Sequence, residues 1–221
     1  MTATQTTNAA TPDAGFDPAR WCETPTLLGE HVRLEPLSID HVDALEAAAA
    51  DGELWKLWFT SIPAPGGMRA YVETALARRD AGTAMPFVVR DAGGTIVGST
   101  RYGHMEHENR RLEIGWTWYA KRAQRTALNT EAKRLLLGHA FDVLCCGSVE
   151  FRTSWFNHAS RAAIARLGAK QDGVLRNHMR MADGSWRDTV VFSIIASEWP
   201  TVRVHLDHLL AHGDRNDGGG A

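Results

Sequence analysis

The chain has 221 residues, of which 44% are hydrophobic, and its 24 Lys and Arg against 26 Asp and Glu give a net charge of −2. This apolar share supports a folded core, and the slightly acidic balance gives no bulk attraction for nucleic acid. No apolar run approaches the roughly 20 residues of a membrane helix, and an odd set of three cysteines makes no disulfide framework, so we expect a cytoplasmic protein without nucleic-acid or membrane partners.

We expect one folded domain over residues 25–212, flanked by two disordered tails. Residues 1–24 and 213–221 are rich in small and polar residues, a composition that buries too little apolar surface to fold. The first residues also lack the basic start and the apolar centre of a secretory signal. Nothing between the tails has the composition of an interdomain linker, and no internal repeat occurs.

The first half of the domain alternates strand and helix patterns. Val32 and Leu34 fall on alternate positions of residues 31–37, which predicts a strand, and Ser38 or Asp40 can cap the helix that follows. The further predicted elements are this helix to residue 50, a helix over 68–79, strands over 85–90 and 95–102, the hairpin turn 91–94, and a loop over 103–110.

Between the first two helices, residues 51–67 are rich in turn residues but carry Trp55, Trp58 and Phe59. Aromatic side chains in a loop either plug the core or line a pocket. Both interpretations stay open.

The centre of the chain, residues 111–141, predicts a strand that leads into a helix. The apolar stripe of the strand, with a period of two, consists of Leu112, Ile114, Trp116 and Trp118. Glu113, Gly115 and Thr117 then lie on the opposite face. The buried stripe of the helix is predicted at Ala132, Leu135, Leu136, His139 and Ala140.

The turn between that strand and helix, residues 121–130, is basic and predicts an anion site. The first N–H groups of a helix have no partner within it, and the helix dipole favours negative charge there. Thr126 or Asn129 can cap this end. We therefore expect a phosphate-bearing ligand at residues 124–130, the alternative being a solvated basic turn.

The second half of the domain continues the mixture of strands and helices. The predicted elements are a strand over 148–153, a helix over 158–167, strands over 173–181 and 186–195 joined by a hairpin, and a helix over 198–211. Antiparallel meanders with inserted helices predict an α+β layered fold and not a doubly wound sheet.

Two motifs resemble one family. The segment from Gln124 to Ala132, QRTALNTEA, resembles the Q-x-x-G-x-A-T-E-A pyrophosphate loop of the GNAT superfamily of N-acetyltransferases. The segment from Asn157 to Ala169 resembles that family's N-x-x-S…LGF segment. The resemblance covers about residues 27–200 and is strongest for the Rim-type branch, the ribosomal-protein alanine acetyltransferases. It implies a GNAT-like fold, with a mostly antiparallel twisted sheet, helices on both faces and a splayed strand pair that holds the cofactor.

The resemblance implies acetyl-CoA as the co-substrate and no metal. The residues it assigns to the phosphates are Gln124, Arg125, Thr126, Ala127, Leu128, Asn129 and Thr130. It assigns the pantetheine arm to the backbone of Trp116, Thr117 and Trp118. It adds Asn157, which capping rules alone make the N-cap of the helix over 158–167. Ala127 replaces the usual glycine, which is tolerable if that residue is already helical.

Acid–base chemistry points to two residues. Many relatives have a tyrosine where this chain has Ile164, so attention moves to Ser160 as the group that protonates the leaving sulfur; the alternative is a small residue on a helix face. Glu113 is the candidate base, since a half-buried carboxylate can take a proton near pH 7. Its rivals are His104, Glu106, His107 and Glu108, and its structural alternative is a salt bridge with Arg111 or Arg101.

The sequence therefore favours an N-acetyltransferase. Its acceptor would be a protein N-terminus, an amino acid or a small amine, and a homodimer is left open. The alternative is a non-catalytic acyl-CoA-binding module. His205, His208 and His212 share a helical face, but no Cys or carboxylate cluster accompanies them, so a metal site is not expected.

Overall fold

The computed structural model describes residues 15–60, 62–181 and 183–213. Residues 1–14 and 214–221, on which most of the two predicted tails fall, lie outside the described residues. Within the described part of the first tail, Pro18–Trp21 forms a short 3-10 helix. The buried Trp21 side chain donates to the carbonyl of Leu144 at 3.1 Å, so this part of the segment packs against the domain.

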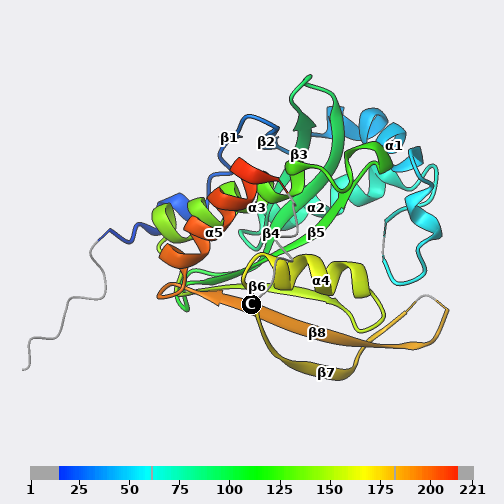
Figure 1. Ribbon diagram of the computed structural model, residues 1–221. Coiled ribbons are helices and arrows are strands. Elements are labelled where there is room, and N and C mark those ends of the chain that lie inside the picture. The colour runs from blue at the N-terminus through cyan, green and yellow to red at the C-terminus, as the bar shows by residue number, and fades with distance from the viewer. Residues whose placement is uncertain (1–14, 61, 182, 214–221) are drawn as a thin grey trace, which may run out of the picture.

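Eight strands of the described residues form one open sheet, in the order β1-β2-β3-β4-β5-β6-β8-β7 (Figure 1). The strands are β1 Leu27–Leu28, β2 Val32–Pro36, β3 Met85–Asp91, β4 Ile96–Glu106, β5 Arg111–Tyr119, β6 Ser148–Ser154, β7 Lys170–Arg180 and β8 Trp186–Ile195. All neighbours are antiparallel except β5 and β6. The predicted α+β fold with a mostly antiparallel sheet is confirmed.

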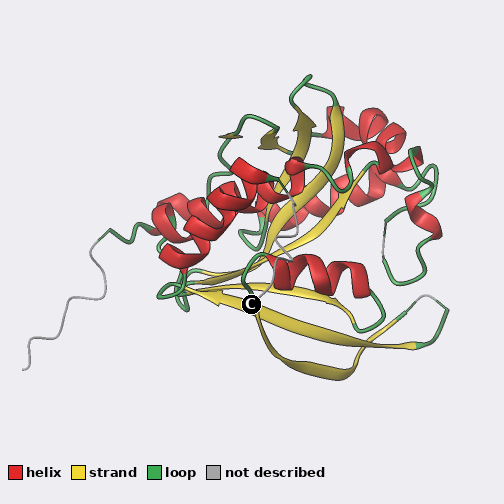
Figure 2. Ribbon diagram, in the orientation of Figure 1, coloured by secondary structure: helices red, strands yellow, loops and turns green. Residues whose placement is uncertain are grey.

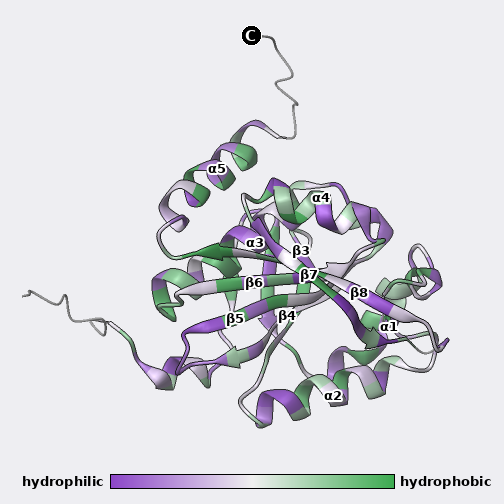
Figure 3. Ribbon diagram, turned by 90° about the horizontal axis from the view of Figure 1, so that it is seen from below, coloured by the Kyte–Doolittle hydropathy of each residue, from purple (hydrophilic) through white to green (hydrophobic). Residues whose placement is uncertain are grey.

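Five α-helices of the described residues cover both faces of this sheet (Figure 2). They are α1 Val42–Ala50, α2 Met68–Asp80, α3 Ala127–Gly138, α4 His158–Arg166 and α5 Trp199–His212. Figure 3 shows α1 and α2 on one face, and α3, α4 and α5 on the other. None of the helices that the structure describes is long and apolar enough to cross a membrane.

Two strand ends differ from the prediction by three or more residues, because bulges break the alternation from which the ends were read. β4 runs to Glu106, so the first part of the predicted loop 103–110 belongs to the strand. β7 begins at Lys170, three residues before the predicted start. A shift of register accompanies each extension, within residues 103–106 and 171–173.

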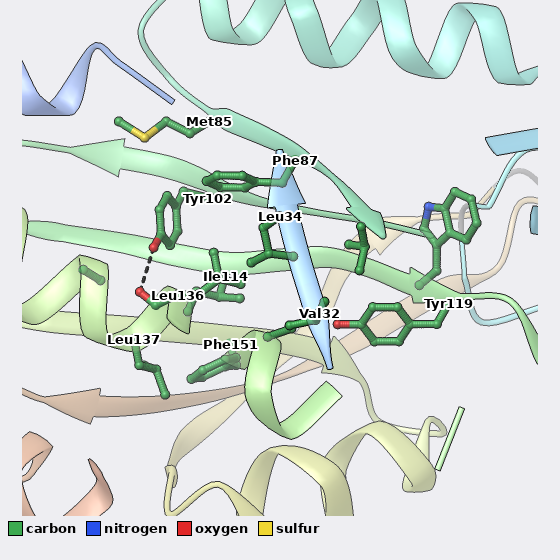
Figure 4. Close-up of a cluster of buried hydrophobic side chains, with 14 of the residues drawn as sticks. Val32, Leu34, Met85, Phe87, Tyr102, Ile114, Tyr119, Leu136, Leu137 and Phe151 are labelled. Atoms are coloured by element: carbon green, nitrogen blue, oxygen red, sulfur yellow. Dashed lines mark hydrogen bonds between the residues drawn. The ribbon is translucent and has the colours of Figure 1, made fainter. Parts of the chain in front are cut away.

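The core between the sheet and α3 explains why these segments meet (Figure 4). Its fully buried side chains include Val32, Leu34, Phe87, Tyr102, Leu136, Leu137 and Phe151. Burial of each large apolar side chain contributes about 1.5–3 kcal/mol. The hydroxyl of Tyr102 donates to the Leu136 carbonyl at 2.7 Å, so the polar end of this ring is satisfied.

The buried stripe predicted for this helix lies partly where expected, and it continues past the end of α3 into the short helical segment His139–Val143. Ala132, Leu136 and Ala140 are buried as expected, but Leu135 and His139 are only partly buried. Leu137 and Lys133 take buried positions instead. The reason is that α3 packs against both the sheet and α5, so its covered surface is wider than one stripe.

A single carboxylate ties α3 to the first hairpin. Glu131 accepts hydrogen bonds from the backbone N–H groups of Glu30, His31 and Val32, at 2.9, 2.6 and 2.9 Å. Gly29 makes room for it, since a Cβ there would lie 2.4 Å from the carboxylate. The Glu of the T-E-A motif therefore has a structural role that its position in the motif did not reveal.

We expect Glu131→Ala to lower the free energy of unfolding by about 2–4 kcal/mol, because hydrogen bonds to charged groups contribute about 1.5–3 kcal/mol each and water replaces part of the loss. Urea denaturation measures this. Glu73→Ala is the matched control. Glu73 is exposed on α2, and its ion pair with Arg69 is long, at 4.0 Å. Removing its carboxylate should therefore lower the free energy of unfolding by less than about 0.5 kcal/mol. Equal losses for the two variants would contradict the anchoring role.

Candidate functional site

β5 and β6 part after three pairs of residues. Residues 111–113 pair in parallel with residues 148–150, although β5 continues to Tyr119 and β6 to Ser154. From residue 114 onward, this edge of β5 has no strand partner in the described part of the chain. The parting leaves backbone N–H and C=O groups of β5 without ladder partners, and it confirms the predicted splayed strand pair.

A β-bulge interrupts the other edge of β5 at Trp116. Ser99 pairs with Trp118 and Arg101 pairs with Gly115, so three steps along β5 oppose two along β4. Trp116 has a φ of 50°, a left-handed conformation that is uncommon for a large aromatic residue. An extra residue in one strand reverses which face the following side chains occupy.

The predicted tryptophan stripe is wrong because of this bulge. Trp118 lies on the face covered by α2, where its indole N–H donates to the hydroxyl of Tyr71 at 3.3 Å. The Trp116 ring lies near Arg101 and His104 of β4. Both tryptophans are therefore on the face of Glu113, not opposite to it.

Gly103 leaves the space that the Trp116 ring occupies. A Cβ at this position would lie 2.3 Å from the indole ring, a distance that no side chain tolerates. Gly103 is the register partner of Glu113. The glycine therefore lets the bulged tryptophan lie flat on β4, beside the candidate base.

Glu113 is buried and already has two basic side chains beside it, those of His104 and Arg152. Its side chain is 7% exposed, and one oxygen lies 2.8 Å from His104 Nδ1 and 3.6 Å from Arg152 Nε. The structural alternative named Arg111 or Arg101 as its partner, and that assignment is wrong. Arg111 pairs with Glu106 and Glu150, and Arg101 lies opposite Gly115. Burial and pairing fit both a structural ion pair and a carboxylate that orients an imidazole.

His104 is the exposed member of this pair. Its side chain is 55% exposed, and a φ of 46° at a second bulge of β4 turns it toward Glu113. With Nδ1 held by the carboxylate, the second ring nitrogen is left for other partners. The arrangement is a buried acid behind an accessible imidazole, which is a common geometry for proton transfer.

The other candidate bases are less suited to accepting a proton. Hydrogen bonds from Arg111 and Asn109 lower the pKa of Glu106 to about 2, so this carboxylate holds no proton near neutral pH and has little affinity for one. His107 and Glu108 are exposed in the turn after β4.

A cavity of about 320 Å³ lies on the same face, and its walls come from the C-terminal end of α2, from β4 and from the bulge. The residues that line it are Arg78, Thr83, Ala84, Arg101, Gly103, His104, Met105, Glu106 and Trp116. Its volume falls within the roughly 300–1,000 Å³ of small-molecule sites. His104 and Trp116 both border it, so the Glu113–His104 pair adjoins the cavity.

The predicted anion site is an exposed helix N-terminus. α3 begins at Ala127, with Thr126 as N-cap; its hydroxyl accepts the Leu128 N–H at 3.3 Å. Residues 124–127 are exposed, and Arg125 has a left-handed φ of 59°. Ala127 is thus helical, which meets the condition under which alanine can replace the usual glycine. The Thr126 cap is confirmed, and Asn129 is in the helix.

The remaining assigned residues of this segment point elsewhere. Leu128 is buried in the core. The buried Thr130 hydroxyl accepts a hydrogen bond from Arg166 of α4 at 2.8 Å, and Gln124 donates to the Tyr119 carbonyl at 2.9 Å. The side chains of Leu128 and Thr130 are therefore not available to a ligand.

A buried lysine underlies the bulge on the opposite face. Lys133 of α3 donates to the Thr117 hydroxyl at 2.8 Å, and that hydroxyl also lies 2.7 Å from the hydroxyl of Thr100. Burial lowers the pKa of Lys133 to about 7. The Thr117 side chain is therefore committed to α3, while its backbone belongs to the bulge.

The second motif forms the start of α4. Asn157 is its N-cap, as predicted, with Oδ1 accepting the Ser160 N–H at 3.0 Å. Ser160 is half-buried in the first turn, and Ile164 is buried below it. α4 lies on the α3 face of the sheet (Figure 3). Glu113 lies on the other face, with Arg101 and Trp118, which contact Tyr71 of α2, so the two candidate catalytic residues lie on opposite sides of the parted strands.

The aromatic segment 51–67 serves one of the two purposes that the sequence left open, since part of it plugs the core. Trp55 packs against the core. Trp58 is 62% exposed, and its ring centroid lies 5.5 Å from that of Phe156 in the loop before α4. Two loops distant in sequence therefore meet through exposed aromatic rings.

From the sequence, Arg101 was only a possible ion-pair partner of Glu113, and its role as a buried cation in the cavity wall was missed. Its signal was present, since an arginine stands among Ser99, Thr100 and Tyr102 in a strand that is buried along most of its length. Among the described residues, no group of three or more His, Cys, Asp or Glu side chains could hold a metal ion.

Known proteins resemble this chain in sequence and in fold. The model of the acetyltransferase (GNAT) domain matches residues 31–170. YdaF of Bacillus subtilis (strain 168), provisionally assigned as a ribosomal N-acetyltransferase, is 30% identical over 106 residues, which are 48% of this chain and 57% of YdaF. The chain thus spans little more than half the length of that relative.

Two solved structures show the likeness of fold. A GCN5-related N-acetyltransferase from Brucella melitensis has a TM-score of 0.77 and 29% identity, over 90% of either chain. RimJ from Mycobacterium smegmatis, solved with CoA-disulfide, has a TM-score of 0.72 and 23% identity, over 87% of this chain and 96% of its own.

Proposed function

This chain belongs to the acetyltransferase (GNAT) domain family, and we propose that it transfers the acetyl group of acetyl-CoA to a primary amine by direct attack. The observation that carries the proposal is the exposed N-terminus of α3 at the end of the parted, bulged strand β5. An anion site and a row of unpaired backbone groups adjoin each other there, and a CoA molecule presents phosphates and amides in the same order.

The residues of this chain fit such a ligand. The phosphates would accept N–H groups from residues 124–130, with Arg125 and Lys121 as nearby cations; neither has a carboxylate partner among the described residues. Arg122 is less available because Asp51 accepts from it at 2.9 Å. The amides of the pantetheine arm would pair with the backbone of residues 116–118, and Asn157 would border the arm from the other strand.

The acceptor would approach from the cavity side. An α-amine has a pKa of about 8, so the attacking amine must lose a proton near neutral pH. We assign that proton to the Glu113–His104 pair, in which the buried carboxylate orients the accessible imidazole or takes the proton through a water. Loss of the proton frees the nitrogen lone pair to attack the thioester carbon.

The leaving group departs on the other side. As the new C–N bond forms and the C–S bond breaks, the thiolate takes up one proton. Ser160, in the first turn of α4, is the residue we assign to donate it, and the second proton that the attacking nitrogen loses as the amide forms restores the Ser160 hydroxyl through solvent. Backbone N–H groups at the bulge would stabilise the negative charge that develops on the carbonyl oxygen. The net products are an N-acetylated amine, the free thiol and the proton taken by the base.

The acceptor class is open to a direct test. YdaF is named for ribosomal N-acetylation, so peptide N-termini belong in the panel with amino acids and small amines. Thiol release from acetyl-CoA should depend on the amine added, and mass spectrometry should find the acetylated product. Binding of acetyl-CoA without thiol release on any amine would favour the non-catalytic acyl-CoA-binding module instead.

Ala127→Pro tests the anion site. Proline is well tolerated at the first position of a helix, and Thr126 already has the extended backbone that precedes proline. The change therefore deletes one N–H donor and leaves α3 intact. We expect CoA affinity, measured by calorimetry, to fall about 10- to 100-fold, which corresponds to one charge-assisted hydrogen bond.

Two controls accompany this variant. Ala127→Gly keeps the N–H, and its CoA affinity should stay within about 1 kcal/mol of the parent. Pantetheine without phosphates should bind the parent and Ala127→Pro equally. Normal CoA affinity in Ala127→Pro would show that the phosphates bind elsewhere.

Glu113→Gln keeps the shape of the base candidate and removes its charge. Turnover at pH 7 should fall roughly 10²–10⁴-fold, the usual worth of a general base. The deficit should shrink as pH rises past the pKa of the acceptor, because free amine is then abundant. Glu108→Gln, an exposed carboxylate in the adjacent turn, is the control and should keep the parent profile.

The structural reading of Glu113 predicts a different result. As a mere partner of Arg152, its loss would lower the melting temperature while turnover per folded molecule stayed normal. Measuring the pH–rate profile and the melting curve on one preparation separates the two readings.

Ser160→Ala should lower turnover more than it raises the KM for acetyl-CoA, because a proton donated to the departing sulfur acts only in the transition state. The comparison of kcat with KM under saturating amine measures this. Ala159→Ser on the exposed neighbouring position is the control for a change of hydroxyl content. If Ser160→Ala turns over at the parent rate, water supplies the proton.

A further inference from the structure

Arg101 is a buried cation for which the described part of the chain supplies no counter-ion. Its relative exposure is 2%, and its Nε has no hydrogen-bond partner within residues 15–60, 62–181 and 183–213. No carboxylate lies within ion-pair distance of it among the described residues. The guanidinium instead lies over two aromatic rings, 5.0 Å from the centroid of Tyr71 and 5.1 Å from that of Trp116.

The acidic groups around Arg101 are already engaged. Glu113 is held by His104 and Arg152, and Glu106 is held by Arg111. Aromatic faces attract a cation but do not neutralise it. A buried charge and an unpaired donor both cost stability unless a partner is supplied. An anion bound beside Arg101 would supply that partner.

Arg101 and His104 both line the 320 Å³ cavity. A second guanidinium, that of Arg78, lies on the rim, 5.7 Å from the Trp116 ring centroid. Of the residues that line the cavity, Glu106 is the acidic one, and its charge is balanced by Arg111. The cavity therefore offers an incoming molecule positive charge at one part of its wall and the candidate proton acceptor at another.

We propose that Arg101 binds a carboxylate of the acceptor, so that the substrate is an amine that also carries a carboxylate. The inference rests on the proposed function and narrows its acceptor class. Packing against two rings fixes the planar guanidinium in one place, and a fixed guanidinium fork matches a carboxylate in two parallel hydrogen bonds. Arg78 is exposed to solvent, so Arg101 is the one arginine of the cavity wall that is buried. One buried cation calls for one negative charge, which favours a carboxylate over a phosphate.

The test compares each acceptor with its own carboxamide, which keeps the amine and the size but removes the charge. An α-amino acid, a β-amino acid and a longer ω-amino acid supply three such pairs. For at least one pair, kcat/KM of the parent should be 100-fold or more higher for the acid, because a site built for a polar group rejects the analogue that lacks it. In Arg101→Met this ratio should fall to within about threefold.

Three further readouts separate recognition from folding. CoA affinity of Arg101→Met should equal that of the parent, and its melting temperature should not fall, since Arg101 has no ion pair to lose. Arg101→Lys keeps the charge but loses the planar guanidinium fork. Its ratio of kcat/KM for acid over carboxamide should therefore lie between that of the parent and that of Arg101→Met. Arg79→Met, which removes an exposed arginine paired with Asp80 on the same helix, should keep the full ratio.

Calorimetry with the same pairs in the presence of CoA, where no transfer takes place, tests the anion site apart from catalysis. Tight binding of the acid and weak binding of the amide, lost in Arg101→Met, would uphold the inference even if acetyl transfer failed. Equal binding and equal kcat/KM of acid and amide by the parent would overturn it while leaving an acetyltransferase intact. Preference for a phosphate-bearing amine over every carboxylate would also overturn it.

Discussion

The parting of β5 from β6 is the constraint on which the other features of this molecule depend. Two parallel strands that stayed paired would satisfy each other's backbone groups along their whole length. Here the pairing stops after residues 111–113, and the rest of that edge of β5 must find other partners or water. The bulge at Trp116 disturbs the opposite edge of the same stretch. A short length of strand is thus unpaired on one side and displaced on the other, within an otherwise continuous sheet.

The rest of the fold keeps this stretch in place. Glu131 fixes the start of α3 to the first hairpin through three backbone N–H groups. Lys133, two residues on, reaches Thr117 in the bulge from the α3 face. On the other face, Tyr71 of α2 bonds Trp118. Contacts from the helices on both faces therefore fix the part of β5 after residue 113, which lacks strand pairing on one edge.

The same parting divides the chemistry between two faces. The cavity with Arg101 and the Glu113–His104 pair lies on the α1 and α2 face, whereas the N-termini of α3 and α4 lie on the other. A group transfer needs a donor and an acceptor that approach one reacting atom from different directions. In the mechanism proposed here, the deprotonating groups and the protonating group are separated by the strand between them.

Sequence alone determined the parts of this protein that local chemistry controls. Period-two and helical patterns located most of the strands and helices, and the caps at Thr126 and Asn157 followed from side chains that bond the N–H groups just after them. The motifs around residues 124–132 and 157–169 identified the family. These features depend on neighbours within a few residues, so a linear reading suffices for them.

Tertiary structure decided what no local pattern encodes. A single extra residue at Trp116 moved the tryptophans to the face of Glu113, because a bulge is defined by the partner strand and not by its own sequence. The partners of Glu113 come from β4 and β6, and those of Arg101 come from α2 and β5. Ion pairs and cavities join residues that are distant along the chain. The sequence could therefore name Glu113, but only the folded chain placed His104 before it and Arg101 beside it.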